Sequence, residues 1–281
     1  MTTPLRKRAV DAPAPDAPVH EPFFVRQDGK YIPQACARGP WDATSLYGRV
    51  IVGLLGHALE QAFGDADFVP ARLTVDMYRL PRLEPVEVTT TLIREGGRLR
   101  VAEAEFISGG VSMAKASCQF LRATKDPDGD VWGPPNWDAP APGQIPPPPV
   151  PDHPVARVWE ARPITGDFGQ KATVRRTWVR DVRQLVDGFA MTPFERAAVA
   201  SDFASPLSHS GSGGLGYINS DVTLYLHRAP VGDWLGFEKR DHQATLGVAV
   251  GECRLYDIEG PIGLIACTAL GQRAALAAPK R

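Results

Sequence analysis

The stretch VAEAEFISGGVSMAKASCQFL, residues 101–121, decides the fold class. Two segments in which apolar and polar residues tend to alternate flank Gly109-Gly110, which is the pattern of a β-hairpin. A related stretch, VAVGECRLYDIEGPIGLIACTAL, occupies residues 248–270, and its Gly260 lies 150 positions after Gly110. Because the pattern occurs twice, the sequence predicts two related halves that are rich in β-strands.

The repeat extends beyond this hairpin. Arg79-Leu80-Pro81 closes an apolar stretch in the first half, and Arg228-Ala229-Pro230 does so 149 residues later. An offset of this length is too long for a solenoid repeat and fits one whole domain fused to a diverged copy of itself. We therefore expect the functional site where the two halves meet.

Composition and charge exclude several classes of protein. The chain has 281 residues, 43% hydrophobic and 22% charged, with a net charge of −1, so it lacks the basic surface of a nucleic-acid-binding protein. No segment stays apolar for the roughly 18 residues that a membrane helix needs. The basic residues 6–8 are followed by Asp11 and a run rich in Ala and Pro, unlike a secretory signal. We expect a cytoplasmic protein with no nucleic-acid partner and no membrane span.

The four cysteines, Cys36, Cys118, Cys253 and Cys267, lack the paired short spacing of a zinc site. We expect reduced and mostly buried thiols. A turn centred on Gly260 would make Cys253 and Cys267 cross-strand neighbours, although a functional disulfide is not expected in a reduced compartment. No cluster of His, Cys or carboxylate residues has the spacing of metal ligands, so the sequence predicts neither a metal nor a cofactor.

Proline-rich segments divide the chain. Residues 1–20 are rich in Ala, Pro and Asp and predict a disordered tail. Residues 126–155 carry many prolines, which favour extended conformation over helix or central strand, and predict a linker whose Trp132 and Trp137 suggest partial packing on the surface. The N-terminal half then spans residues 21–125 and the C-terminal half residues 156–281.

Each half contains one substantial helix followed by several strands. The first helix is expected to start after the cap-type residues Thr44-Ser45 and to end near Gly64, and the second to run from Pro193 to about Phe203. Strands are predicted at 71–79, 86–95, 99–108 and 111–121, and then at 172–178, 218–226, 234–239, 245–256 and 262–270. This α+β pattern is the arrangement of a double hotdog, in which two curved antiparallel sheets each wrap a central helix.

The chain resembles the type II acyl-CoA thioesterases, which are double-hotdog enzymes, from about Phe23 to Ala275. The motifs that carry the resemblance are Arg38-Gly39-Pro40, Tyr47-Gly48-Arg49, Ala116-Ser117-Cys118-Gln119, Ala200-Ser201-Asp202-Phe203 and Leu226-His227-Arg228. The resemblance implies a hydrolase of lipid metabolism whose partner is acyl-CoA or another acyl thioester. The oligomeric state stays open, with a homo-oligomer as one outcome.

Asp202 is the leading candidate for catalysis. It ends an otherwise apolar helical run, where an inward-facing carboxylate is costly unless it is paired or functional. The resemblance implies that an aspartate here acts with a small polar residue on the next strand and a glutamine on the last strand to activate the water that attacks the thioester. The alternative, an aspartate that ends the helix near the surface, stays open.

The family pattern carries over only in part. The small polar position falls on Asn219, or on Ser220 if the register differs by one residue, and the glutamine position falls on Leu270. A leucine side chain cannot hydrogen-bond to water. Gln272 lies two residues further, about 6.6 Å along the same face, and would substitute only at an irregularity such as a bulge. A binding protein that has kept the pocket and lost hydrolysis is therefore the second hypothesis.

The start of the first helix is the candidate oxyanion and substrate-binding site. Backbone N–H groups around Gly48 and Arg49 would favour developing negative charge there. Close packing of the helix start explains Gly48 equally well.

Two other motifs suggest different functions. The segment from Asp202 to His209 is similar to the signature of hotdog enoyl-CoA hydratases, but Ser205 stands where they have Asn, and the His comes two residues later. Residues 211–216, GSGGLG, match the letters of a dinucleotide-binding motif, yet they follow a predicted helix and precede a strand, the reverse of its context. We expect this segment to be a flexible loop beside Asp202, and we expect His209, just before it, to be solvated.

Overall fold

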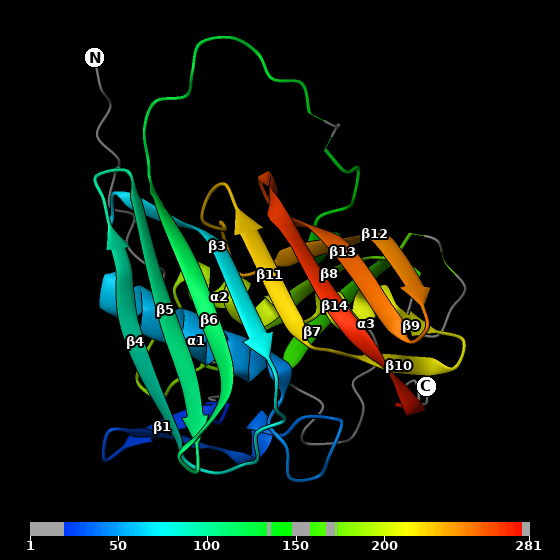
Figure 1. The fold of residues 1–281 in the computed structure, drawn as a ribbon. Helices are drawn as coiled ribbons and strands as arrows, with labels where there is room; N and C mark the ends of the chain where they lie inside the picture. The colour runs from blue at the N-terminus through cyan, green and yellow to red at the C-terminus, as the bar shows by residue number, and fades with distance from the viewer. Residues whose placement is uncertain (1–19, 134–135, 148–157, 167–171, 173, 277–281) are drawn as a thin grey trace.

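The computed structural model describes residues 20–133, 136–147, 158–166, 172 and 174–276. Residues 1–19 of the predicted tail and parts of the predicted linker lie outside these ranges. The described strands form one 14-stranded antiparallel sheet (Figure 1) with the path β1-β2-β4-β5-β6-β3-β11-β14-β13-β12-β8-β7, while β10 pairs with both β14 and β9.

The strands of the first half are β1 (Phe24–Gln27), β2 (Lys30–Pro33), β3 (Phe68–Met77), β4 (Val86–Glu95), β5 (Leu99–Ser108) and β6 (Val111–Arg122). Those of the second half are β7 (Trp159–Thr165), β8 (Arg176–Asp181), β9 (Ser210–Gly211), β10 (Gly214–Asn219), β11 (Asp221–Leu226), β12 (Leu235–Thr245), β13 (Val248–Asp257) and β14 (Gly260–Leu276). The helices are α1 (Gly48–Phe63), α2 (Pro193–Ser201) and α3 (Ala204–His209), with short 3₁₀ turns at Ala35–Ala37 and Pro142–Gln144.

The two halves share one sheet, which corrects the prediction of two separate sheets that each wrap a helix. The antiparallel α+β character is confirmed. The sheet is continuous because β3 of the first half pairs with β11 of the second, as Figure 1 shows near the middle of the sheet. In that view the long strands lie in front of the helices. Helix α1 packs on β3 to β6, α2 packs mainly on α1, and α3 packs on β10 and β12 to β14.

The junction between β3 and β11 reflects the internal repeat. Thr74 lies opposite Thr223, with 3.2 Å between their hydroxyl oxygens, and the two residues are 149 positions apart. A residue that pairs with its own repeat counterpart across an antiparallel ladder marks a local two-fold axis, as at the interface of a symmetric dimer. The duplication seen in the sequence is therefore expressed as a two-fold arrangement around this pair.

Helix α1 begins at Gly48, within the Tyr47-Gly48-Arg49 motif that predicts its start, and the cap-type residues Thr44-Ser45 do not cap it. Its N-cap is Tyr47, whereas Thr44 and Ser45 hydrogen-bond Asp42 in the preceding turn. Helix α1 ends at Phe63 and is capped by Gly64, as predicted; the N–H of Gly64 donates to the carbonyl of Glu60 at 2.8 Å. The turn before the helix therefore uses the hydroxyl groups that would otherwise cap it.

The second predicted helix, Pro193 to about Phe203, corresponds to α2, and the short helix α3 that follows it was not predicted. Thr192 caps α2 in a reciprocal capping box with Glu195, and the chain then breaks at Asp202-Phe203 before α3 starts. Pro206 supplies a local cause, because it has no N–H for the carbonyl four residues earlier and its ring would clash with that carbonyl. That residue is Asp202, whose carbonyl instead accepts a bond from the N–H of Ser205 at 3.2 Å.

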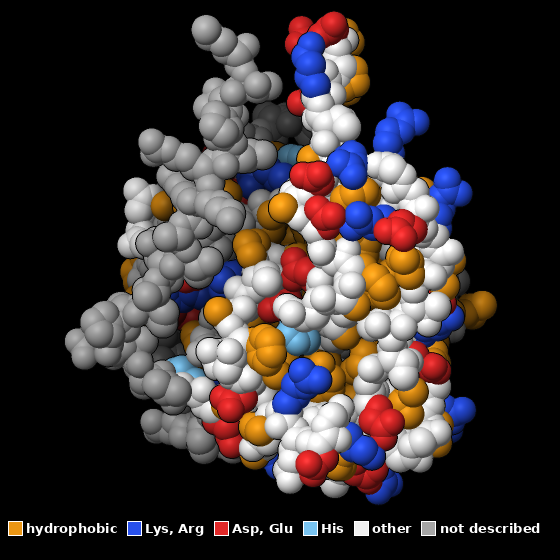
Figure 2. Space-filling view, turned by 90° about the vertical axis from the view of Figure 1, so that its left-hand side faces the viewer, with side chains coloured by type: hydrophobic (Ala, Val, Ile, Leu, Met, Phe, Trp, Pro, Cys, Tyr) orange, Lys and Arg blue, Asp and Glu red, His pale blue; other side chains and the backbone are white. Residues whose placement is uncertain are grey.

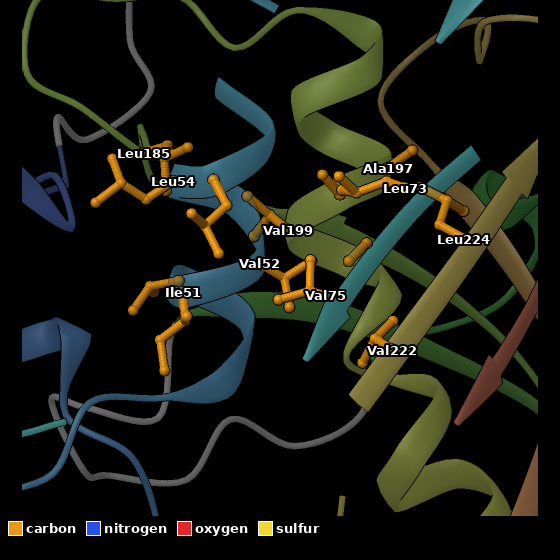
Figure 3. Close-up of a cluster of buried hydrophobic side chains, with 14 of the residues drawn as sticks. Ile51, Val52, Leu54, Leu73, Val75, Leu185, Ala197, Val199, Val222 and Leu224 are labelled. Carbon is orange, nitrogen blue, oxygen red and sulfur yellow. The ribbon is translucent and has the colours of Figure 1, made fainter. Parts of the chain in front are cut away.

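The helices of the two halves approach closely in the core. A Cβ added to Gly56 of α1 would lie 2.9 Å from the Cβ of Ala198 in α2, so glycine is needed for this approach. Figure 3 shows apolar side chains of α1 and α2 directed toward one another and toward strands β3 and β11. A buried hydrogen bond, with 2.5 Å between Nδ1 of His57 and Oε1 of Glu195, also joins α1 to α2. The core thus runs across the junction between the halves.

The predicted pairing of two cysteines is wrong. Asp257 pairs with Gly260, so the turn lies at residues 258–259, and the register shifts between Leu255 and Tyr256. Cys253 consequently lies opposite Ile265, and Cys267 lies opposite Gly251. All four cysteines are free and buried, as expected of reduced thiols.

The described part of the linker packs on the second half through Trp137. Its ring stacks on Tyr256, with centroids 4.2 Å apart and an angle of 6°, and meets the edge of Trp178 at 5.0 Å. A Cβ on Gly236 would lie 2.4 Å from the Trp137 ring, so Gly236 makes room for it. By contrast Trp132 is 92% exposed, so only one of the two tryptophans packs as expected.

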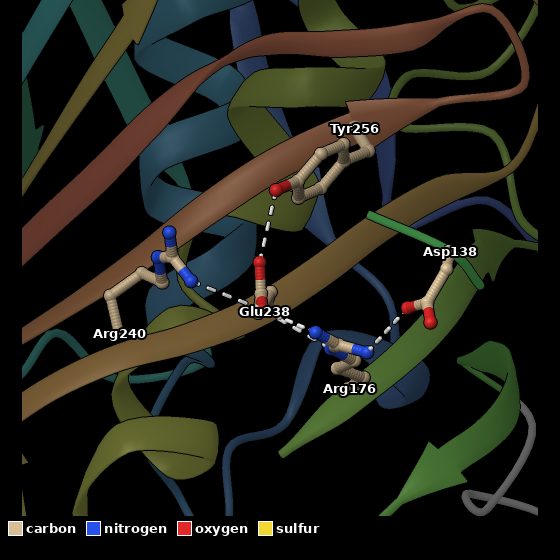
Figure 4. A network of polar contacts seen from close by, with 5 residues as sticks. All are labelled: Asp138, Arg176, Glu238, Arg240 and Tyr256. Carbon is tan, nitrogen blue, oxygen red and sulfur yellow. Dashed lines mark hydrogen bonds and ion pairs between the residues drawn. The ribbon is translucent and has the colours of Figure 1, made fainter. Parts of the chain in front are cut away.

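A polar network surrounds this contact. Glu238 accepts hydrogen bonds from Arg176 at 3.0 Å and from the Tyr256 hydroxyl at 2.9 Å (Figure 4). Arg176 also binds Asp138 of the linker at 3.1 Å. The buried Glu238 is thereby balanced by basic and hydroxyl donors, and the linker is tied to β8 and β12.

Charged side chains are mixed on the face shown in Figure 2. Acidic and basic groups alternate with apolar ones over the described part of this face, instead of gathering by sign. This agrees with the near-zero net charge.

Candidate functional site

Asp202 lies where the two halves meet. It is the C-cap residue of α2 and only 6% exposed. A Cβ placed on Gly48 would come within 2.9 Å of each Asp202 carboxylate oxygen, so this carboxylate sits directly against the first residue of α1. The N-terminus of the helix from the first half therefore faces the carboxylate from the second.

Two groups hydrogen-bond the Asp202 carboxylate. Nδ2 of Asn219, the last residue of β10, donates to Oδ1 at 2.9 Å, and the backbone N–H of Arg49 donates as well. Burial raises the pKa of Asp202, while the bonds from Asn219 and Arg49 and the charge of Arg49 oppose this rise. A carboxyl with a raised pKa is a stronger base once ionised, and the helix N-terminus favours that ionised form.

Ser220 faces a different neighbour. Its hydroxyl lies 2.9 Å from the Thr268 hydroxyl, and Asp221 accepts the Thr268 backbone N–H at 2.6 Å. Of the two register alternatives left by the sequence, Asn219 is the residue that contacts Asp202.

The structure does not bring Leu270 or Gln272 to Asp202. Leu270 pairs with Ile218 and Val248 and is 52% exposed. An irregularity in the pairing of β10 with β14 does occur, between Leu215 and Tyr217. Gln272 is nevertheless exposed, and its Nε2 donates to the carbonyl of Leu270 at 3.2 Å. The irregularity thus leaves Gln272 at the surface.

The Arg49 side chain reaches across to the second half. Its guanidinium forms a buried ion pair with Asp181, the last residue of β8, and its Cζ lies 4.6 Å from the centre of the Trp159 ring. Burial raises the pKa of Asp181, and the Arg49 charge opposes this. The pair holds the start of α1 beside β8. Sequence analysis missed Asp181, since no local motif connects it with a residue 132 positions away.

His209 is not solvated, contrary to the prediction. It is the last residue of α3 and 4% exposed. Its Nδ1 lies 2.9 Å from Nδ1 of His242, and its Nε2 lies 3.5 Å from Sγ of Cys267. Asp202 is bonded elsewhere, so the structure does not assemble the Asp and His pair of the hydratase alternative.

The glycine-rich segment is a hairpin and not the expected loop. Gly214 pairs with Gly211 and Leu215 with Ser210. The segment lies between α3 and β11, which agrees with the exclusion of a dinucleotide-binding motif.

Within the described ranges, no three side chains of His, Cys, Asp or Glu converge in a way that could hold a metal ion. No helix in that part of the chain has the length and apolar character to span a membrane.

Comparison with family models decides the family. Residues 37–125 match the acyl-CoA thioesterase N-terminal domain, and residues 125–270 match the acyl-CoA thioesterase C-terminal domain. The chain belongs to the acyl-CoA thioesterase family. Membership supports thioester hydrolysis in general, and the two family domains meet at the start of the proline-rich linker.

Solved structures agree on the fold of this thioesterase-family chain. A tesB protein of Mycobacterium avium subspecies paratuberculosis superposes with a TM-score of 0.66 at 17% identity, covering 88% of this chain and 94% of that one. A protein of unknown function with a hot dog fold from Alicyclobacillus acidocaldarius superposes with a TM-score of 0.69 at 15% identity, covering 89% of this chain and 95% of that one. Acyl-CoA thioesterase II of Mycobacterium marinum superposes with a TM-score of 0.59 at 18% identity, covering 80% of this chain and 90% of that one. No curated protein matches. The fold is therefore of the hotdog type.

Proposed function

We propose that this protein hydrolyses acyl-CoA or a related acyl thioester, with Asp202 as the general base. The observation that carries the proposal is the buried Asp202 carboxylate, bonded to Asn219 and in contact with the N-terminus of α1. A cytoplasmic location and a homo-oligomer stay predictions from the sequence.

The chemistry follows from this geometry. Asp202 accepts a proton from a water molecule as the water oxygen attacks the thioester carbonyl carbon. The carbonyl oxygen takes up the negative charge, and the Gly48 N–H, which has no acceptor within α1 by its position at the helix start, is the candidate donor to it. Collapse of the tetrahedral intermediate breaks the carbon–sulfur bond, and the proton held by Asp202 passes to the leaving thiolate. Asn219 orients the carboxylate throughout.

One observation favours a second candidate function. The family position for glutamine is Leu270, which is exposed and away from Asp202, and Gln272 does not replace it. With fewer polar groups to hold water, the pocket would bind an acyl thioester without cleaving it.

Thiol release from a panel of acyl-CoA substrates tests the proposal. Purified protein should release free thiol, and Asp202→Asn should lower the rate at least about 100-fold while ligand binding is kept, because general-base catalysis contributes that much or more. Asp128→Asn, in the exposed part of the linker, is the matched control and should behave like the unaltered protein.

Other outcomes separate the alternatives. Binding without thiol release at any chain length would support the binding protein. Loss of enoyl-CoA absorbance without thiol release would support the hydratase. Full activity of Asp202→Asn would contradict the assignment of Asp202.

A further inference from the structure

A pocket of about 310 Å³ lies in the second half, apart from the contact between Asp202 and α1. Its walls are the end of α3, the hairpin β9–β10 and strand β12. Serine and glycine residues line it together with His209, Tyr217, Lys239 and His242. The pocket therefore combines polar backbone with basic side chains.

The basic side chains have no acidic counterpart in the pocket. Among the described residues that line it, none is Asp or Glu. In the same part of the chain, no carboxylate lies within ion-pair distance of Lys239. The neighbouring Asp241 is exposed, and its Oδ1 accepts the backbone N–H of His242 at 2.8 Å and Nε2 of Gln243 at 3.0 Å. Lys239 thus borders the hollow beside two imidazoles, with no counter-ion from the walls that the structure describes.

A further positive charge lies behind the pocket. Arg175 is 3% exposed, its Nη1 donates to the carbonyl of Leu207 at 3.2 Å, and its own carbonyl accepts the N–H of Lys239 at 2.8 Å. Burial and the Arg175 charge lower the pKa of Lys239. Burial, His242 and Lys239 lower the pKa of His209 to about 4. A bound anion would offset the positive charge of Lys239.

The shape of the pocket suits a multiply charged anion. The hairpin residues 210–214 turn tightly, with Gly214 at a φ of 92°, and these small serine and glycine residues border the hollow. A volume of about 310 Å³ exceeds what a single carboxylate fills. Tyr217, Lys239 and His242 of the lining carry hydrogen-bond donors, and several donors favour an ion with several oxygens.

We propose that this pocket binds a phosphate-bearing anion. Tyr217 of the pocket lies two residues before Asn219 on β10, so the pocket begins about 6.6 Å along the strand from the partner of Asp202. The phosphates of a coenzyme A thioester are one source of such an anion, and that source rests on the proposed function. A free phosphorylated compound is the other source, and it does not depend on hydrolysis.

Titration calorimetry with inorganic pyrophosphate tests the anion site on the full chain. The unaltered protein should bind pyrophosphate, and Lys239→Met should weaken binding at least about tenfold, because a paired charge is lost from a partly buried site. Lys115→Met, which removes an exposed lysine of the first half, is the matched control and should bind as the unaltered protein does. Should Lys239→Met fold poorly by circular dichroism, His242→Gln replaces it.

Three results would overturn the anion site. The first is that the unaltered protein does not bind pyrophosphate at millimolar concentration. The second is that Lys239→Met binds pyrophosphate as tightly as the unaltered protein does. The third is that Lys115→Met and Lys239→Met weaken binding equally, which would mean non-specific electrostatic attraction.

A comparison of substrates identifies the source. If the pocket holds the substrate's phosphates, Lys239→Met raises KM for an acyl-CoA while kcat, and KM for the matching acyl-pantetheine, stay unchanged. If it holds a free phosphorylated compound, both KM values stay unchanged while pyrophosphate binding is weakened. Absence of hydrolysis in the unaltered protein would contradict the proposed function, and the calorimetry would still decide the anion site.

Discussion

At the scale of single residues, the environment of Asp202 sets its acid–base behaviour. Burial raises the pKa of this carboxyl group, and the hydrogen bonds from Asn219 and from the start of α1 lower it. The repeat counterpart of Asp202, 149 positions earlier, is Gly53, where an added Cβ would lie 2.4 Å from Cγ2 of Val199. The first half uses this position for packing, so only the second half contributes a carboxylate.

Replacing Asn219 should change the pH dependence of hydrolysis. Asn219 lowers the pKa of Asp202, so Asn219→Ala should raise it further. A general base must be deprotonated, and the acid limb of kcat/KM against pH should therefore move to higher pH. Ser220→Ala, which alters a side chain bonded to Thr268, should leave the limb in place. A limb that stays fixed or moves to lower pH in Asn219→Ala would contradict the role assigned to this contact.

At the scale of elements, the contact between α1 and α2 depends on small residues. The close approach at Gly56 and Ala198 allows the helices to bring Gly48 against Asp202. The interruption at Asp202-Phe203 then lets the chain enter α3, where His209 reaches the pocket. The helices thus connect the candidate catalytic contact with the proposed anion site.

Gly56→Ala should destabilise the fold. The added methyl group meets the Cβ of Ala198, which is attached to backbone and cannot rotate away, and overpacking of this kind costs about 1–3 kcal/mol. The higher helix propensity of alanine offsets up to about 1 kcal/mol of this. Urea unfolding should show a lower midpoint, whereas Gly97→Ala, in a turn with open space around it, should not. An unchanged midpoint for Gly56→Ala would mean that α1 and α2 lie further apart.

At the scale of the whole molecule, the continuous sheet and the docked linker join the two halves. Strands β3 and β11 pair around Thr74 and Thr223, and Trp137 attaches the linker to β8, β12 and β13 of the second half. The linker follows directly from the last strand of the first half, so its docking restrains the connection between the halves.

Trp137→Ala should release the linker. Loss of the stacked ring should lower the free energy of unfolding by about 1–3 kcal/mol and speed protease cleavage within residues 123–147. Trp132→Ala is the matched control, because Trp132 is almost fully exposed and should change neither quantity. Limited proteolysis followed by mass spectrometry measures the cleavage sites. Equal cleavage of the two variants would contradict the docking role of Trp137.

Local pattern was enough to predict much of this molecule. Strands β4 and β5 have the predicted bounds, because alternation and flanking glycines are properties of neighbouring residues. The repeat and the choice of Asp202 as candidate also follow from the sequence alone. The register of β13 on β14 was lost because the turn lies at residues 258–259 and not at Gly260, and a misplaced turn shifts every pair of the hairpin.

Only the tertiary structure decided which distant residues meet. It joined the halves into one sheet, selected Asn219 over Ser220 at Asp202, left Leu270 and Gln272 at the surface, and brought Asp181 to Arg49 and His242 to His209. Strand and helix patterns arise from residues a few positions apart, which a sequence displays directly. Contact between residues on different elements depends on how the whole chain buries its apolar faces, and no local pattern records that outcome.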